Sequence, residues 1–399
     1  MLAHSPPFPI IIDHFHKDRH VHDDRMTEDD VEGIVLALAH RDRVRRIRFR
    51  TPLPTPEKII APIDGAFPML EYLCIAPMHN MNILLPKTFQ APQLRHLILV
   101  NLIRPIEFPL LSAATGLVAL SLVNILPSTH LQPYELLHRV SLMPQLEILW
   151  IRFDPSSSGD HVDLDLTHMD NATRITLPHL RFFEFCGFNT YSEVLLSRIT
   201  APHLESVSIT FWEEWTYSVP YLLQFMSTSD DLRLGGAVLS FNSGGARLSV
   251  YPNETARVSV FDLFIAGGPG RKVSNAAQIL TALRPLFSSV VYLTLNYKDY
   301  RFLPELQDEA EPTDWRVLLR SFNNVKILFV AKGVVEKLSR SLQFDDGDPP
   351  NALLPELRRI IFSPPNDNVD SFTGFIDARQ HAGHPVILAH HQDAESNPS

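Results

Sequence analysis

The chain has 399 residues, and 35 basic against 45 acidic side chains give a formal net charge of −10 at pH 7. With 45% hydrophobic and 20% charged residues, it can form a large core, which excludes global disorder. The acidic balance argues against nucleic acid or an anionic membrane as the partner.

The two cysteines, Cys74 and Cys186, lie far apart in the sequence. They offer neither a disulfide framework nor a zinc-binding set, which indicates a reducing compartment. No apolar run approaches the roughly 18 residues that span a bilayer, and the first residues lack the pattern of a secretory signal. We therefore expect a cytoplasmic or nuclear location and no membrane partner.

Strand-like segments recur along the chain. After a first strand expected at residues 9–12, ten segments fit the pattern LxxLxL, and six of them follow an apolar-Pro-x-Leu signature. They are residues 44–49, 70–75, 94–99, 117–122, 146–151, 180–185, 204–209, 290–295, 325–330 and 357–362. Degenerate strands are expected at 237–241 and 257–265. A leucine-rich repeat has about 20–29 residues, so several of these units are long and irregular.

Helical patterns alternate with these strands. The first, residues 27–40, opens with Thr27 and the first-turn acid Asp30, which is typical of a helix cap. The others are residues 132–142, 192–199, 219–226, 275–287, 314–322, 333–342 and 371–380. One strand and one helix or irregular return per unit predicts a repeat array with a parallel sheet.

The predicted fold class is therefore α/β. We expect an irregular leucine-rich-repeat solenoid with a curved parallel β-sheet and helices on its convex side. A single array of about 11–13 repeats would cover residues 1–389, and a disordered tail would cover residues 390–399. The alternative is a doubly wound α/β fold with coincidental leucines.

Alternation along a strand predicts which side chains face outward. The fourth and sixth residues of LxxLxL should point into the core, and the third and fifth should point away from it. These outward positions combine arginine with aromatic residues, the usual composition of interface hot spots. The candidate partner-binding residues on this concave face are Arg46, Arg48, Tyr72, His96, Ile148, Trp150, Phe182, Glu184, Tyr292 and Phe329. A loop or terminal segment covering these side chains is the alternative.

The strings at residues 67–73 and 91–99, the opening at residues 8–13 and the stretch 26–47 carry a family resemblance. The chain resembles the F-box-type leucine-rich-repeat proteins of mushroom-forming fungi (basidiomycetes). In that family an N-terminal F-box docks on an SCF adaptor, and the repeats are thought to hold a target for ubiquitination. The resemblance implies the same architecture and role here.

The chain departs from that family in two places. An F-box needs about 40 residues of compact helices after an LPxE-like turn, but residues 17–24 offer no apolar helix face. We therefore expect an F-box-like protein that lacks a recognisable F-box, either a repeat-only paralogue or a sequence begun too far downstream. The ninth position of the units also lacks the usual asparagine, since it is occupied by Met78, Leu102, Asp154 and Phe188. No continuous asparagine ladder is expected.

Two clusters of residues combine side chains that could bind a metal ion or a phosphate. Residues 13–24 mix imidazoles and carboxylates that could ligate a transition metal, but Lys17 and Arg19 would oppose a cation, so a solvated loop is favoured. The glycine-rich turn at residues 267–272 precedes a helix and lacks the P-loop spacing, so a return loop is favoured. With no GxSxG, HExxH or CxxC motif, we expect no catalytic residues, metal or cofactor.

These observations lead to three hypotheses of function. The first is protein–protein interaction, as substrate recognition in an F-box/SCF-type ubiquitin ligase system. The second is a repeat-only scaffold without a ubiquitin role, and the third is an unrecognised hydrolase or metal enzyme. The partners expected are a protein target and the SCF adaptor, with no nucleic acid.

Overall fold

The computed structural model is a mixed α/β protein whose strands are mostly parallel. Its chain divides into two compact units: unit 1 comprises residues 1–187 and 194–204, and unit 2 comprises residues 188–193 and 205–399. The structure describes residues 8–15, 27–51, 56–77, 85–101, 110–125, 132–154, 173–212, 214, 216–229, 231–268, 270–297, 311–343, 352–362 and 369–390.

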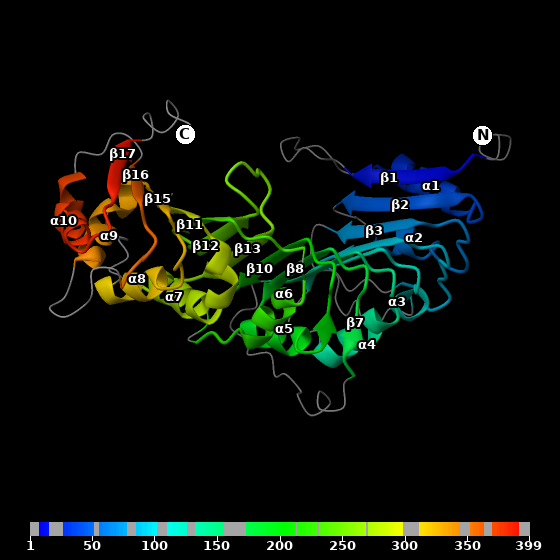
Figure 1. Cartoon of the computed structure of the whole chain (residues 1–399). Coiled ribbons are helices and arrows are strands. Elements are labelled where there is room, and N and C mark those ends of the chain that lie inside the picture. Colours follow the sequence, from blue (N-terminus) through cyan, green and yellow to red (C-terminus); the bar gives the residue numbers. More distant parts are fainter. Residues whose placement is uncertain are drawn as a thin grey trace. The chain divides into compact units, whose positions relative to one another are not determined.

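The sheet of unit 1 follows the chain. Its strands are β1 (Ile10–Phe15), β2 (Val44–Thr51), β3 (Tyr72–Pro77), β4 (His96–Val100), β5 (Ala119–Ile125), β6 (Ile148–Phe153) and β8 (Phe182–Gly187). Each pairs in parallel with the next, and Figure 1 shows β1, β2 and β3 side by side. The helices are α1 (Glu28–Leu38), α2 (Pro56–Ile60), α3 (Leu110–Ala113), α4 (Pro133–Ser141) and the end of α5 (Asn189–Leu196).

The sheet of unit 2 contains strands β10 (Ser206–Phe211), β11 (Gly236–Asn242), β12 (Gly245–Tyr251), β13 (Phe261–Ala266), β14 (Tyr292–Tyr297), β15 (Ile327–Val330), β16 (Arg359–Phe362) and β17 (Ile387–His390). Their order is β10-β13-β12-β11-β14-β15-β16-β17. The helices are α6 (Pro220–Ser227), α7 (Lys272–Ala282), α8 (Pro312–Leu319), α9 (Val335–Leu342) and α10 (Thr373–His381), with 3-10 turns η5 (Arg284–Ser289), η7 (Lys332–Val334) and η8 (Val369–Phe372).

All ten LxxLxL segments form strands, as predicted. Their first, fourth and sixth residues are buried throughout, as Leu94, Leu97 and Leu99 illustrate. The predicted helices are also present, with ends that shift by a few residues. Helix α1 has the expected cap, because Thr27 and Asp30 form a reciprocal capping box.

The proline signature marks a β-turn before the strand. The backbone N–H of the leucine donates to the carbonyl of the apolar residue three positions earlier, at 3.0–3.2 Å, in the turns that end at Leu70, Leu94, Leu146, Leu180 and Leu357. Proline occupies the second turn position, where its fixed φ is favourable. A second parallel ladder precedes some of these turns: Ala66 pairs with Gln90, and β7 (Ile175–Thr176) pairs with β9 (Ile199–Thr200). Neighbouring LxxLxL segments are therefore linked both through their strands and through the residues before the turn.

The expectation of a wholly parallel sheet is wrong at one place in unit 2. Strand β12, which the sequence analysis missed, runs antiparallel to both β11 and β13. Ser243 and Gly244 join β11 to β12 as a two-residue loop, so the alternating runs on either side form a hairpin. β11 and β13 then pair in parallel with β14 and β10.

Three short strands were also not predicted, namely β7, β9 and β17. The expected tail begins at His390, which is the last residue of β17. The remainder of that tail, residues 391–399, lies outside the described residues.

Candidate protein-binding face

The side chains that point outward from the strands of unit 1 lie in two rows, which we call the unit-1 face. The strand register aligns Arg46, Tyr72, His96, Ala119, Ile148 and Phe182 in the first row. It aligns Asp13, Arg48, Cys74, Ile98, Ser121, Trp150 and Glu184 in the second. All eight of the unit-1 residues predicted from the sequence are therefore on one surface.

One end of this face is basic and aromatic. The Arg46 guanidinium lies over the Tyr72 ring, 4.4 Å from its centroid, and the Tyr72 and His96 rings are 5.8 Å apart. Asp13 of β1 lies between two cations, with Oδ2 at 3.7 Å from Arg46 and 3.8 Å from Arg48. Both ion pairs are long and partly exposed, so their contribution to stability is small. Burial, the largest influence, raises the pKa of Tyr72.

The other end of the face is apolar. Phe182 is 41% exposed, and the Arg181 guanidinium lies 5.6 Å from its ring centroid. Arg152 contacts the Trp150 ring at 5.7 Å and pairs with Glu184 at 3.2 Å. Burial raises the pKa of Glu184, and its interactions with Arg152 and Trp150 act in the opposite direction. This end offers large, partly exposed aromatic surface next to paired charges.

Between these two ends the face carries small side chains. Strand β5 contributes Ala119 and Ser121, and both are buried by their larger neighbours, as is Cys74 on β3. Desolvation raises the pKa of the Cys74 thiol to about 11, which keeps it protonated and unreactive near neutral pH. The unit-1 face is therefore not uniformly exposed, because small outward residues fall below the level of the aromatic rings.

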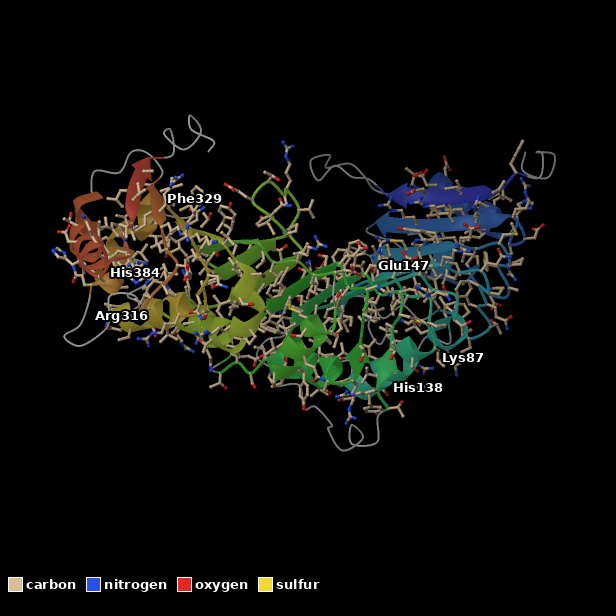
Figure 2. All side chains as sticks on the ribbon, viewed as in Figure 1. Lys87, His138, Glu147, Arg316, Phe329 and His384 are labelled. Atoms are coloured by element: carbon tan, nitrogen blue, oxygen red, sulfur yellow. The ribbon has the colours of Figure 1, made fainter. Side chains whose placement is uncertain are left out.

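In unit 2 the predicted residues Tyr292 and Phe329 lie on adjacent parallel strands, β14 and β15. They occupy different rows, because Tyr292 is aligned with Ile327 and Phe329 with Thr294. Figure 2 labels Phe329 of β15 and, at a separate place in this view, Arg316 of helix α8. Burial raises the pKa of Tyr292, and a hydrogen bond with Glu254 adds to this effect.

Three charged residues of the unit-1 face were not predicted from the sequence. Asp13 was assigned to the histidine-rich cluster, but its strand register places it beside Arg48. Counted from Leu146, Arg152 is the seventh residue of its LxxLxL segment, one alternation beyond the third and fifth positions. Arg181 is the second residue of the next segment, which begins at Leu180. Continuing the outward alternation from the fifth to the seventh position identifies Arg152. Asp13 can be placed only from the pairing of β1 with β2.

A short asparagine pair connects the ends of β4 and β5. Asn101 and Asn124 both have a left-handed backbone, with φ of 54°. The Asn124 side-chain amide donates to Asn101 Oδ1 at 2.8 Å, and the Asn101 amide donates to the Pro77 carbonyl at 2.6 Å. Counted from Leu94 and Leu117, these residues are eighth in their LxxLxL segments, one position before the ninth, where a leucine-rich repeat usually has asparagine. A continuous ladder was not expected, and this pair links three successive strand ends.

Most of the proposed histidine-rich metal cluster, residues 16–24, lies outside the described residues. Among the residues that the structure does describe, no group of three His, Cys, Asp or Glu side chains is arranged to hold a metal ion. The described helices include none that is long and apolar enough to cross a membrane.

Comparison with models of known protein families finds no match, and comparison with curated proteins also finds none.

Proposed function

We propose that the chain is an irregular leucine-rich-repeat solenoid that binds another protein through the unit-1 face. The observation that carries this proposal is the row of partly exposed Arg, Tyr, Ile, Trp and Phe side chains on the surface opposite the buried strand positions. The repeated turn-strand unit, the second parallel ladder and the Asn101–Asn124 pair support the repeat architecture. Interface hot spots are enriched in Trp, Tyr and Arg.

The resemblance described above favours one role for this binding: substrate recognition in an F-box/SCF-type ubiquitin ligase system. The alternative is a repeat-only interaction scaffold without a ubiquitin role. A pull-down of the chain with the purified SCF adaptor from the same organism separates the two. A second sample should use the chain extended upstream in its gene, because the adaptor-binding segment is not recognisable in residues 1–26.

The binding proposal predicts the effect of removing the aromatic anchors. Replacing Trp150 and Phe182 by alanine should reduce capture of specific partners from a lysate of the source organism by at least about tenfold, because hot-spot truncations cost about 2 kcal/mol or more. Quantitative mass spectrometry of the captured proteins provides the measurement. Partners that bind the unmodified chain and are lost with the double variant would identify the target.

The matched control is Tyr221→Ala, which removes a 42% exposed aromatic side chain from helix α6. Circular dichroism and urea unfolding should show that each variant is folded. Equal capture by the unmodified chain and the folded Trp150→Ala/Phe182→Ala variant would contradict the proposed site.

A further inference from the structure

The unit-1 face is more basic than the chain as a whole. The two rows and the residues just before or after them, together with Arg152 one alternation beyond Trp150, contain six arginines and four carboxylates. The arginines are Arg45, Arg46, Arg48, Arg95, Arg152 and Arg181, and the carboxylates are Asp13, Glu71, Glu147 and Glu184. The chain carries a net charge of −10, so this local excess of arginine favours a partner with acidic groups at this surface.

The two arginines of β2 and the large apolar side chains lie at opposite ends of the face. Arg46 and Arg48 on β2 can donate hydrogen bonds to acidic groups, and the apolar anchors are Ile148 and Trp150 on β6 with Phe182 on β8. Four strand-to-strand steps lie between β2 and β6, which correspond to roughly 19 Å at about 4.8 Å per step. An extended peptide advances roughly 3.3 Å per residue, so about six residues cover this distance.

The middle of the face permits a backbone to cross. At β5, which lies between the two ends, the outward side chains are Ala119 and Ser121, with exposed fractions of 7% and 5%. Small side chains at this strand allow close approach of an extended main chain.

Asp13 shows how the basic end receives a carboxylate. Its Oδ2 lies at long ion-pair distance from both arginines, and its side chain is 36% exposed. A carboxylate from a partner would therefore share Arg46 and Arg48 with Asp13, whose own ion pairs with them are long. Asp13 moderates the positive charge at this end and sets a limit on how strongly an acidic partner is attracted.

We propose that the unit-1 face binds an extended acidic peptide segment, in which a pair of carboxylates lies about six residues from an aromatic or large aliphatic anchor. The carboxylates contact Arg46 and Arg48, the segment crosses β3, β4 and β5, and the anchor contacts Trp150 and Phe182. This inference rests on the proposed function and adds the chemistry and spacing of the partner.

Fluorescence anisotropy with labelled synthetic peptides tests the inference at physiological salt. The first peptide carries two glutamates about six residues from a Trp-Leu pair, joined by a Gly/Ser spacer. The second has the same composition with the glutamates next to the Trp-Leu pair, and the third has lysines in place of the glutamates. We expect the first to bind at least tenfold more tightly than either of the others.

Variants of the full chain assign the two ends. Arg46→Glu/Arg48→Glu and Trp150→Ala/Phe182→Ala should each weaken binding of the first peptide at least tenfold, and Asp13→Asn should strengthen it. The matched charge control is Arg320→Glu/Arg358→Glu, which reverses two exposed arginines of unit 2 and should leave binding unchanged. An equal loss with this control would show a general charge effect and overturn the inference.

Two further outcomes would also overturn it. Equal affinity for all three peptides would reject the acidic, spaced segment. If, with that peptide result, lysate partners were still lost with Trp150→Ala/Phe182→Ala, the proposed function would stand although this inference had failed. Tighter binding of a single-stranded oligonucleotide than of the first peptide would assign the basic and aromatic face to nucleic acid, since that combination also binds phosphates and stacks bases.

Discussion

At the scale of single residues, Glu193 illustrates a buried charge that has a defined structural task. Helix α6 begins after Val219, whose side chain cannot cap it, and the Glu193 carboxylate of α5 accepts the free N–H groups of Tyr221 at 2.8 Å and Leu222 at 3.0 Å. Burial is the largest influence on this group and raises its pKa from 4.5 to about 7, against the two N–H bonds that lower it. The side chain therefore joins α5 to α6 within unit 2, at a cost in desolvation.

This raised pKa predicts how stability depends on pH. Between about pH 4.5 and 7 the folded state holds a proton on Glu193 that the unfolded state releases, so this group's contribution to the free energy of unfolding decreases as pH rises. In Glu193→Gln that contribution is absent. Between pH 5 and pH 8 the unmodified chain should lose about 1–3 kcal/mol more stability than the variant, measured by urea unfolding.

The control is Glu336→Gln, which changes an exposed carboxylate of α9. Parallel pH profiles for the unmodified chain and Glu193→Gln would show that the buried carboxylate does not titrate in this range.

The same scale shows what a sequence can predict about individual residues. Leu97 and Leu99 were predicted to be buried because they follow the period of a strand, and both are. Arg379 was not anticipated, because an arginine in a helix is normally exposed. It is fully buried and donates to the carbonyls of Pro355 and Leu357, at 3.1 and 3.0 Å. Only the packing of α10 against the turn before β16 gives this side chain its partners.

At the scale of elements, the β11–β12 hairpin depends on Gly245. This residue has φ of +150°, and a Cβ atom placed on it would lie 2.1 Å from the carbonyl oxygen of Ile265. Gly245→Ala should therefore separate the start of β12 from the end of β13 and lower the free energy of unfolding by at least about 2 kcal/mol. Urea unfolding measures the loss.

Gly33 provides a control of opposite sign. It lies inside helix α1, and a Cβ atom there would meet no other group within 4 Å. Gly33→Ala should stabilise the chain by about 0.5–1 kcal/mol, because alanine loses less backbone entropy in a helix. A Gly245→Ala variant as stable as the unmodified chain, or more stable, would contradict the geometry at Gly245.

Element identity was more predictable than element order. The ten LxxLxL strands carry their own signal, since leucine spacing and the proline turn are local features. The pattern at Ala237–Phe241 indicated a strand, and β11 is there, but nothing local shows that β13 rather than β11 lies beside β10. The pairing partners are set by the antiparallel meander of β11, β12 and β13 as a whole. For the candidate face the same distinction holds: alternation predicted its residues, while the register supplied Asp13.

At the scale of the whole molecule, each unit has a sheet that ends in a strand with one described partner. Unit 1 ends at β1, where Ile11 is 63% exposed, and unit 2 ends at β17, where Ile387 is 62% exposed. An open strand edge with an exposed apolar side chain is a site of self-association. The net charge of −10 at pH 7 opposes it, but the isoelectric point is about 6.0.

We therefore expect light scattering by the purified chain to be highest near pH 6, where repulsion between molecules is weakest. Ile11→Lys/Ile387→Lys should reduce this scattering. Val258→Lys/Val317→Lys makes the same change of charge at exposed positions outside the strands and should have a smaller effect. Similar reductions by both pairs would show that charge alone, and not the strand edges, controls association.

The meander of unit 2 has a consequence for synthesis of the chain. Strand β10 ends at Phe211, but its neighbour β13 begins only at Phe261, fifty residues later. At about 5–20 residues per second, the ribosome needs roughly 3–10 s to supply that neighbour. During this interval the nascent chain contains β11, which has the same direction as β13 and can compete for β10. The β11–β12 hairpin can form locally during this interval, and β13 can join β12 as soon as it is made. The completed three strands then hold β11 three positions away from β10.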